Sequence, residues 1–594
     1  MRRRKSPERI ATERRRRRTV VIACSTAGFA VAGFAGWLAY EGAQVNSNLE
    51  KAKNFATQSK DSLIDGDSEA AETSATDADR YAQDALDAST SLPWKLAASL
   101  PVLGSPFTTT QQLTSIVTGL TTNVLLPAVD AGAAIAPDQL IHDGGRLDLT
   151  ALRDAEPVLS ETATAAAELD ARSRQVDSTY LGPVDDARVQ LQAQTADLAS
   201  LLRNTATAAK VAPAMLGADG PRSYFIGFQT NAEARGTGGL LGGFGVVRAE
   251  NGAVRVDDLA SNRELRTDDY QPIDLGPDFD GIYGQSRPTT DFRNSNVSSH
   301  FPYAAQIWRS LWLQESGEQV DGVVATDPVA LSYVLDVVGP VTLPGGERIT
   351  AENVVELTES TAYTRFADDN AARKNYLQSV ASAVVEKMTG RIGRPQALLE
   401  ALGRATSEGR LAVWSANPGE QAVLAHSPLG HTVPDDPAPY AGVVVNNLGG
   451  NKLDYHLRRE IEYTAASCDG VTRESTVTVR LTNDLPEDRF TNYVAGMFDN
   501  PVGAPFGTNL ADVSLVATQG AQLEKLTVNG KSTLHFTGRE LGHPVFTVQV
   551  PIPRGETAEF VYSLTEPVAA GEARVPVQPL VDDPAVSVDV PTCG

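Results

Sequence analysis

The chain has 594 residues, with 51 lysines and arginines against 74 aspartates and glutamates, so its net charge is −23 at pH 7. A chain of this length is expected to form several domains. Because the first residues are strongly basic, the rest of the chain is more acidic than the total indicates, which argues against nucleic acid as a partner.

The start of the chain has the pattern of a membrane anchor. Residues 1–18 include the basic run Arg14–Arg18, and Thr19–Tyr40 contains no charged residue. At 1.5 Å per residue a helix over this stretch would be roughly 33 Å long, enough to cross a bilayer. We therefore predict a basic cytoplasmic tail over 1–18, a single-pass transmembrane helix over 19–40 and an extracytoplasmic remainder. A cleaved signal peptide is the alternative, but no convincing small-residue cleavage site follows the apolar stretch.

Residues 41–212 are predicted to form an all-α region. Apolar residues recur at a spacing of three to four in four segments: Leu49–Leu86, Gln111–Leu126, Leu149–Leu169 and Val184–Leu202. Two prolines and a glycine interrupt the pattern within Ser91–Gly104. This break is expected to be a loop that either packs between helices or lies on the membrane surface.

Residues 213–435 alternate between strand and helix patterns, which predicts an α/β domain. The expected strands are at Tyr224–Phe228, Gly245–Arg248, Ala253–Val256 and Val320–Thr326, and the expected helices at Tyr303–Leu313, Pro328–Val337, Ala351–Ser360 and Arg373–Met388. Asp278–Ser299 is a long polar stretch, expected to be a flexible loop or part of a binding site.

Residues 440–594 contain alternating apolar and polar runs, which predict an antiparallel β-sandwich. Asn529-Gly530 stands between two such runs and indicates a two-residue hairpin turn. Of the three cysteines, Cys24 falls in the predicted membrane helix, which leaves Cys468 and Cys593 to form a disulfide or to remain free thiols.

The glycine-rich run Gly236–Gly245 lacks the spacing of a dinucleotide fingerprint and has no Gly-Lys-Ser/Thr of a phosphate loop. The histidines are scattered and give no zinc spacing. A strand packed closely on its neighbour is the ordinary explanation for these glycines.

Arginines within apolar and glycine-rich sequence are the best candidates for a site. Arg235 precedes the glycine run, Arg263 follows a predicted strand, and Arg365 and Arg373 flank a pair of carboxylates at Asp368-Asp369. Guanidinium groups beside glycines suit an anionic ligand, because the planar fork binds phosphate and glycine admits main-chain amides. The structural alternative is a helical ion pair between Arg365 and Asp369, four residues apart.

Five motifs occur in this order along the chain: Asn231-x-Glu-x-Arg235-x-Thr-Gly-Gly239, Val320-Asp-Gly-Val323, Asp327-Pro328, Gly339-Pro-Val341 and Glu352-Asn-Val354. In these motifs the chain resembles an actinobacterial membrane-anchored family known as domain of unknown function 4012. This resemblance implies an architecture and no activity.

A second, remote resemblance is to the LytR-CpsA-Psr family, which transfers glycopolymers from polyprenyl-pyrophosphate lipids to peptidoglycan. It rests on four segments in the family's order: Arg235-Gly-Thr-Gly, Ser261-Asn-Arg-Glu264, Val334–Val341, and Tyr363-Thr-Arg-Phe with Asp369 and Arg373. The chain departs from the family's pattern at Thr237, Glu264 and Ala367, where Asp, Asp and Arg would be expected.

The LytR-CpsA-Psr resemblance implies that Arg263, Arg365 and Arg373 clamp the pyrophosphate with help from Arg235. It places Ser261, Tyr363 and Lys374 in the substrate site, and it gives Asp369 or Glu264 to Mg²⁺ or to the acceptor proton. The expected partners are the membrane, a polyprenyl-pyrophosphate-linked glycan and peptidoglycan. The alternative function is a non-catalytic envelope scaffold or glycan-binding protein with a degenerate site.

Overall fold

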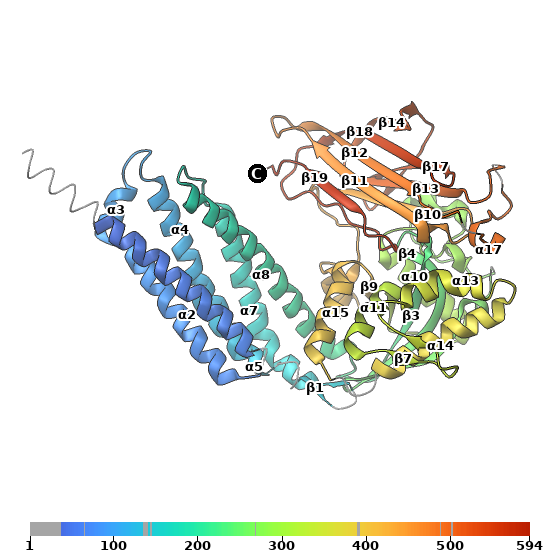
Figure 1. Cartoon of the computed structure of the whole chain (residues 1–594), viewed down its shortest axis with the longest axis horizontal. Coiled ribbons are helices and arrows are strands. Elements are labelled where there is room, and N and C mark those ends of the chain that lie inside the picture. The colour runs from blue at the N-terminus through green and yellow to red at the C-terminus, as the bar shows by residue number, and fades with distance from the viewer. Residues whose placement is uncertain are drawn as a thin grey trace, which may run out of the picture. The chain divides into compact units, whose positions relative to one another are not determined.

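The structure is a computed structural model that describes residues 37–63, 66–134, 140–142, 145–267, 269–388, 393–487, 489–500 and 503–593. The chain divides into two compact units (Figure 1). The first is drawn from Met1–Leu140 and Thr150–Lys210, and the second from Ile141–Leu149 and Val211–Gly594.

The fold class predicted for the whole chain requires a correction at its membrane helix. Most of the predicted Thr19–Tyr40 segment, residues 19–36, lies outside the described residues. In the part of the chain that the structure does describe, no helix has both the length and the apolar character needed to span a bilayer. The described architecture therefore consists of a helical unit followed by a unit built on mixed sheets.

The first unit is built from helices. After a helix over residues 37–63 come α2 (Ser68–Ser89), α3 (Leu92–Ala98), α4 (Ser105–Leu120), the π-helical turn η1 (Thr121–Leu125), α5 (Leu126–Ala134), α7 (Leu149–Arg174) and α8 (Gly182–Met215). The helix predicted over Leu49–Leu86 is thus two helices, separated by a turn in which Gly66 has φ +77°. The predicted Ser91–Gly104 loop contains α3, which begins with Pro93 in its first turn, where proline is tolerated.

Alanines form the buried face of α2. Ala71, Ala75, Ala78, Ala82 and Ala85 are all fully buried, at spacings of three and four residues. This spacing places them on one helical stripe, and their small side chains let neighbouring helices approach closely. The alanine-rich composition therefore reflects packing as well as helix propensity.

The second unit contains a five-stranded mixed sheet in the order β5-β4-β3-β6-β9. Its strands are β3 (Arg222–Arg235), β4 (Gly238–Glu250), β5 (Ala253–Ser261), β6 (Gly322–Thr326) and β9 (Leu411–Ser415). β3 and β6 are parallel, and the other neighbours are antiparallel. Short hairpins are formed by β1 (Ile141–His142) with β2 (Arg146–Leu147) and by β7 (Val341–Thr342) with β8 (Arg348–Ile349).

Helices cover both faces of this sheet. They are α9 (Pro277–Tyr283), α10 (Phe301–Ser316), α11 (Pro328–Val338), α12 (Val354–Glu356), the π-helical η5 (Leu357–Thr361), α13 (Ala362–Arg365), α14 (Asn370–Met388), α15 (Pro395–Ser407) and α16 (Pro418–Leu424). Adjacent residues of β3 point to opposite faces. Phe225 belongs to the core that contains Trp308 of α10, whereas Tyr224 packs with Leu424 of α16.

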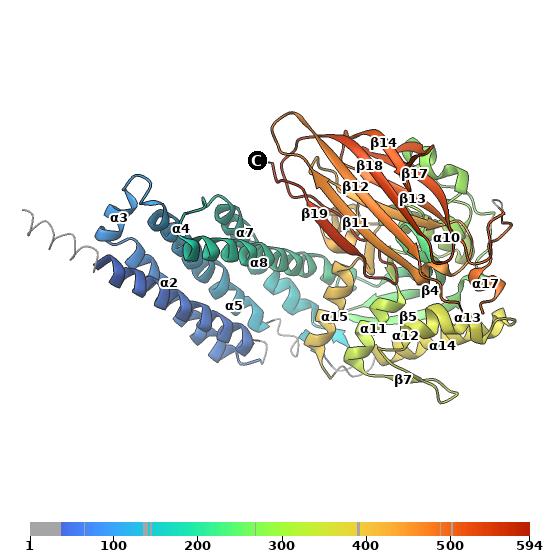
Figure 2. The ribbon, with the colours of Figure 1, turned by 45° about the horizontal axis from the view of Figure 1, so that its top comes forward.

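The C-terminal part of this unit is a β-sandwich (Figure 2). One sheet has the order β10-β13-β17-β16 and the other β15-β14-β18-β12-β11-β19. The strands are β10 (Ala441–Asn447), β11 (Leu457–Ala465), β12 (Thr472–Asn483), β13 (Asn509–Ala517), β14 (Gln522–Val528), β15 (Lys531–Ser532), β16 (Phe536–Glu540), β17 (His543–Ile552), β18 (Thr557–Pro567) and β19 (Ala585–Asp589), with the short α17 (Asn492–Ala495) beside them.

Two details of the sandwich bear on the sequence predictions. The Asn529-Gly530 turn is confirmed: Val528 pairs with Lys531, and both turn residues have positive φ. The purely antiparallel arrangement is wrong at one edge, because β19 pairs with β11 in parallel. The last strand comes from a long C-terminal return, which no local turn signal specifies.

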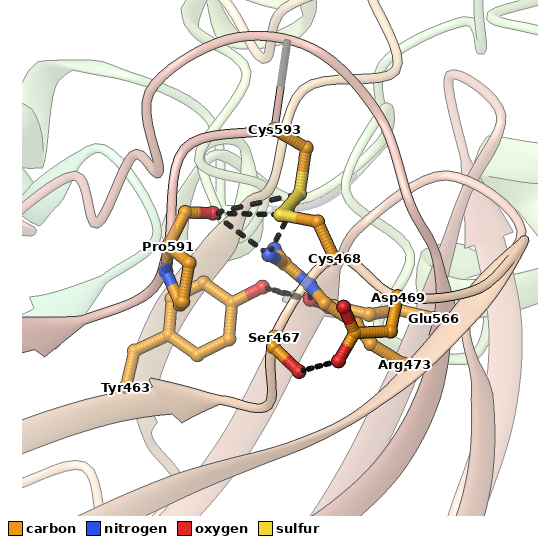
Figure 3. Close-up of a disulfide and its surroundings, with 8 residues drawn as sticks. All are labelled: Tyr463, Ser467, Cys468, Asp469, Arg473, Glu566, Pro591 and Cys593. Atoms are coloured by element: carbon orange, nitrogen blue, oxygen red, sulfur yellow. Dashed lines mark hydrogen bonds and ion pairs between the residues drawn. A yellow bond between two sulfur atoms is a disulfide. The ribbon is translucent and has the colours of Figure 1, made fainter.

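The two cysteines left open by the sequence form a disulfide at a Cα–Cα distance of 5.8 Å (Figure 3). Arg473 lies beside this disulfide, and its guanidinium donates to the Pro591 carbonyl and to Glu566, both at 2.9 Å. Arg473 and Glu566 are fully buried, and Tyr463 also donates to Glu566. The bond therefore ties the C-terminal segment to a buried ion pair in the sandwich.

Candidate functional site

An apolar pocket of about 100 Å³ lies in the second unit, among the strands β3, β4 and β5 and the helices α11 and α14. Its apolar walls include Phe228, Phe244, Leu259, Leu331, Leu377 and Val380. β4 comes close to its neighbour strand here, because a Cβ added at Gly242 would lie 2.3 Å from the Thr230 hydroxyl. We call this the α14 pocket.

Lys374 is the basic residue of the α14 pocket. Its ammonium donates to the Gly242 carbonyl at 3.4 Å, and it forms no ion pair with a carboxylate among the described residues. Burial and the nearby charges of Lys452 and Arg373 lower the pKa of Lys374 to about 7. An anion placed in this pocket would therefore meet a cation that has no carboxylate partner of its own.

Two buried carboxyl groups also line the pocket. Glu359 of η5 accepts a hydrogen bond from the Ala232 amide at 2.9 Å, and burial raises its pKa to about 7. Asp327 caps α11 by accepting from the Ala330 amide, and it pairs with Arg410 at 3.0 Å. Burial raises the pKa of Asp327 although Arg410 opposes the shift.

The Asn231–Arg235 segment is a bulge of β3 beside this pocket. The pairing with β4 jumps from Thr230–Leu240 to Ala234–Gly239, so three residues of β3 have no partner on β4. Such a bulge re-aims side chains away from the ladder. Here it directs Glu233 to Arg235, at 3.1 Å, and to Lys452.

Glu233 is held as a carboxylate between these two cations. Burial alone would raise its pKa, but the charges of Lys452 and Arg235 hold it below the usual value. The same interaction raises the pKa of Lys452. We call Asn231, Glu233, Arg235, Asp327, Arg410, Lys452 and Asp454 the bulge cluster.

The bulge cluster joins the mixed sheet to the sandwich. Asp454 accepts from the Ala234 amide at 2.8 Å, and Arg235 donates to the Asn447 carbonyl at 3.2 Å. The segment before β19 also contributes, since Asn231 donates to the Pro579 carbonyl and Gln578 donates to the Arg235 carbonyl. The motif that carried the first family resemblance thus lies in a buried structural junction.

Tyr363 and Arg373 extend this buried region. The Arg373 guanidinium lies 5.0 Å from the ring of Tyr363 and 4.1 Å from that of Tyr493. It donates to Asn370 at 2.6 Å, and its side chain is almost completely buried. Arg373 therefore lies against two tyrosine rings and does not line the α14 pocket.

Arg365 and Asp369 have separate structural partners. Arg365 forms a bidentate ion pair with Glu347, both bonds at 2.9 Å, and stacks on Tyr376. The helical pair predicted between Arg365 and Asp369 is not the one observed. Asp369 instead caps α14 by accepting from the Ala372 amide at 2.9 Å.

Ser261 and its neighbours lie at the other side of the pocket. Ser261 lines the pocket and accepts from the Arg263 amide at 3.3 Å. Arg263 and Glu264 are exposed in the turn η2 (Asn262–Glu264), and the charge of Arg263 contributes to the lowered pKa of Lys374. Of the predicted site residues, the structure places Ser261 and Lys374 on the pocket, with Arg263 nearby.

Asp369 and Glu264, the residues predicted to bind Mg²⁺, lie at the cap of α14 and in the turn η2, and the magnesium site stays a prediction. The part of the chain that the structure describes contains no group of three or more His, Cys, Asp or Glu side chains able to hold a metal ion.

Several residues of this region were not predicted from the sequence. Glu359 could have been predicted as a buried carboxylate. It is four residues from Val355 and four from Tyr363, which places it on the apolar stripe of a helix. Asp278–Ser299 is an ordered segment rather than a flexible loop, and its Asn296 amide donates to Gln229, Thr237 and Gly239 beneath the bulge. Lys452 gave no signal, because its partner is 219 residues away.

Comparison with known structures found a crystal structure from Legionella pneumophila, described as a "putative nutrient binding protein", at 9% identity and a TM-score of 0.16. The match covers 24% of this chain and 50% of that one, so it carries no weight for fold or function. Comparison with curated proteins gave no match. The resemblance to the LytR-CpsA-Psr family and an actinobacterial origin are not shown by these comparisons. Residues 219–363, from just before β3 to Tyr363, match the family described as "Protein of unknown function (DUF4012)".

Proposed function

We propose that this protein is an extracytoplasmic cell-envelope protein that binds a lipid-linked glycan at the α14 pocket without transferring it. The ligand class is an amphiphile with a polyprenyl tail and a phosphate or pyrophosphate head. The observation that carries the proposal is the α14 pocket itself, where an apolar cavity meets the unpaired ammonium of Lys374. The disulfide supports an oxidising compartment.

The charges around the pocket favour binding over chemistry. Phosphoryl transfer requires several cations aligned on the reacting phosphate. Arg235 and Arg365 are instead neutralised by Glu233 and Glu347, and Arg373 lies against two tyrosine rings. Lys374, with Arg263 nearby, supplies enough positive charge to hold a head group. These two residues do not form the set of aligned cations that a phosphoryl-transfer transition state requires.

The size of the cavity limits what it holds. Ligand pockets commonly measure about 300–1,000 Å³. At about 100 Å³, the α14 pocket takes the first part of the tail, with the head group beside Lys374. The rest of the ligand extends along the surface.

The first experiment is mass analysis of organic extracts from the purified full chain, which requires no assumption about the acceptor. Binding of a short-chain polyprenyl phosphate is then measured by titration calorimetry. We expect Lys374→Met to weaken binding about tenfold, because a charge-assisted hydrogen bond to phosphate is lost. Ala381→Phe, which fills the pocket from α14, should abolish binding.

Lys387→Met is the matched control, because Lys387 is an exposed lysine on the same helix. The proposal is wrong if Lys374→Met and Lys387→Met bind alike, or if Ala381→Phe binds as well as the unchanged protein. Turnover of a polyprenyl-pyrophosphate substrate would instead support the transferase alternative.

A further inference from the structure

One end of the helical unit exposes a group of large apolar side chains. The fractions exposed are 70% for Leu92, 53% for Leu96, 84% for Val102 and 61% for Leu103. With Leu100, Tyr180 and Leu181, which are also exposed, we call these residues the apolar tip. Single exposed leucines are ordinary, but five large aliphatic residues within twelve positions form a patch.

The apolar tip belongs to an ordered structure. Trp94 of α3 is buried, donates to the Phe107 carbonyl at 3.0 Å and packs edge-on against the Phe107 ring. The turn before α4 is tight, because a Cβ added at Gly104 would lie 2.2 Å from the Ala98 carbonyl oxygen. The apolar side chains of this segment are therefore presented by a rigid support.

A second loop is fixed to the same support. The Tyr180 hydroxyl donates to the Leu103 carbonyl at 3.1 Å, and Ser105 and Thr179 share a hydrogen bond of 2.9 Å. Figures 1 and 2 show α3 and the α7–α8 connection at the same end of the helices. The tip thus combines two segments that are far apart in the sequence.

The backbone also holds one tip residue in an uncommon conformation. Val102 has φ +64°. Positive φ is strained for a β-branched residue, and such strain persists only where the surrounding structure imposes it. Here it keeps Val102 turned outward, where the side chain makes little contact with the protein.

The charge pattern distinguishes this end from the rest of an acidic protein. Between Asp87 and Asp130 the chain has no aspartate or glutamate, although its net charge is −23. Lys95 is the charged residue of that stretch and is exposed. At the second loop Arg174 pairs with Asp170 at 3.0 Å, and Asp185 accepts from the Thr179 amide and pairs with Arg188 at 2.8 Å.

We propose that the apolar tip inserts into the surface of a lipid bilayer. Leucine and valine side chains would enter the acyl boundary, while Lys95 meets anionic head groups and the Tyr180 ring lies at the interface. If a protein partner bound here, we would expect this end of the helical unit to present a concave or flat apolar face surrounded by a polar rim. The apolar tip is instead a rigid projection. It carries a lysine, and neither α3 nor the turn after it contains a carboxylate. These features suit a lipid surface.

Depth-dependent fluorescence on the full chain tests this proposal at single positions. An environment-sensitive nitrobenzoxadiazole label is placed at Leu103→Cys in a Cys24→Ser background, because the other two cysteines are bonded to each other. Vesicles contain phosphatidylglycerol and phosphatidylcholine. We expect the label at position 103 to shift to the blue and to gain about twofold or more in intensity as it enters the interface.

Lys60→Cys provides the matched control position. Lys60 is exposed on the helix over residues 37–63, in which Gly42 lies close to Trp94. Eighteen residues of helix separate Gly42 from Lys60, which is about 27 Å. A label there should stay in water even when another part of the chain holds the protein on the vesicle.

A second variant changes the chemistry of the tip. Leu100→Asp with Val102→Asp and Leu103→Asp should reduce the vesicle partition coefficient about tenfold or more, with unchanged circular dichroism. Equal responses at positions 103 and 60 would overturn the proposal. A response at 103 that requires no vesicles and grows with protein concentration would also overturn it, since a second copy would then cover the tip.

Discussion

Replacing Glu233 by Gln should destabilise the second unit strongly, and a second substitution should restore much of the loss. Glu233 is the carboxylate shared by Arg235 and Lys452, and all three side chains are less than a tenth exposed. Glu233→Gln preserves the shape of the side chain but leaves two buried cations without a carboxylate in contact. Lys452→Met then removes one of them.

The expected loss of stability follows from the burial of these ion pairs. Removing one partner of a buried ion pair costs about 3–5 kcal/mol, because the remaining charge is left uncompensated. The cost of Glu233→Gln should lie at the upper end of this range, because two cations lose their carboxylate partner. Lys452→Met alone should cost less, because Glu233 and Arg235 remain paired at 3.1 Å. In the double variant Arg235 keeps three carbonyl acceptors, at Arg293, Ala234 and Asn447.

The double variant should therefore be at least about 1–2 kcal/mol more stable than Glu233→Gln alone. The measurement is urea unfolding followed by circular dichroism and by tryptophan fluorescence. Three of the five tryptophans, Trp308, Trp312 and Trp414, belong to the second unit and report on it.

Glu559→Gln is the matched control, because its ion pair with Arg480 is about 40% exposed. This substitution should change stability by less than about 1 kcal/mol. If Glu233→Gln costs no more than Glu559→Gln, or if Lys452→Met adds a full further loss, then the bulge cluster does not hold the sheet and the sandwich together as described.

Further predictions concern pH and the disulfide. Amphiphile binding should strengthen as the pH falls from 8 to 6, because Lys374 gains its proton near pH 7, and Lys374→Met should reduce this dependence in calorimetric titrations. Glu359→Gln should stabilise the protein above pH 7 but not at pH 4. The pKa of Glu359 is raised in the folded protein, so the free energy of unfolding falls as the pH rises from about 4.5 to 7, and glutamine removes this loss. Cys468→Ser with Cys593→Ser opens a loop with a sequence separation of 125 and should cost about 2–5 kcal/mol in urea unfolding.

Local features of the second unit were predictable from the sequence. Alternating runs marked strands such as β12, and Asn529-Gly530 identified a hairpin, because both signals depend on residues close together in the chain. The parallel pairing of β19 with β11 was not predictable, since it depends on a segment more than a hundred residues away. Register and direction at such an edge follow from the tertiary fold.

The candidate site was predictable in part, for the same reason. Lys374 and Ser261 were named from the sequence and do line one pocket. Arg365 was expected beside them, but Glu347 holds it elsewhere. A sequence shows which side chains carry charge, whereas the partner that neutralises each charge is chosen by the fold.

The distinction between a buried ion pair and an anion site therefore rests on the source of the opposite charge. Arg235 and Arg410 are buried, but the protein itself supplies the carboxylates of Glu233 and Asp327 to them. Lys374 has no such partner among the described residues, and its pKa is lowered by burial instead of raised by a carboxylate. A buried cation is costly unless something compensates it. The charge missing from the protein at Lys374 is the reason to place the head group of a ligand there and not at the arginines.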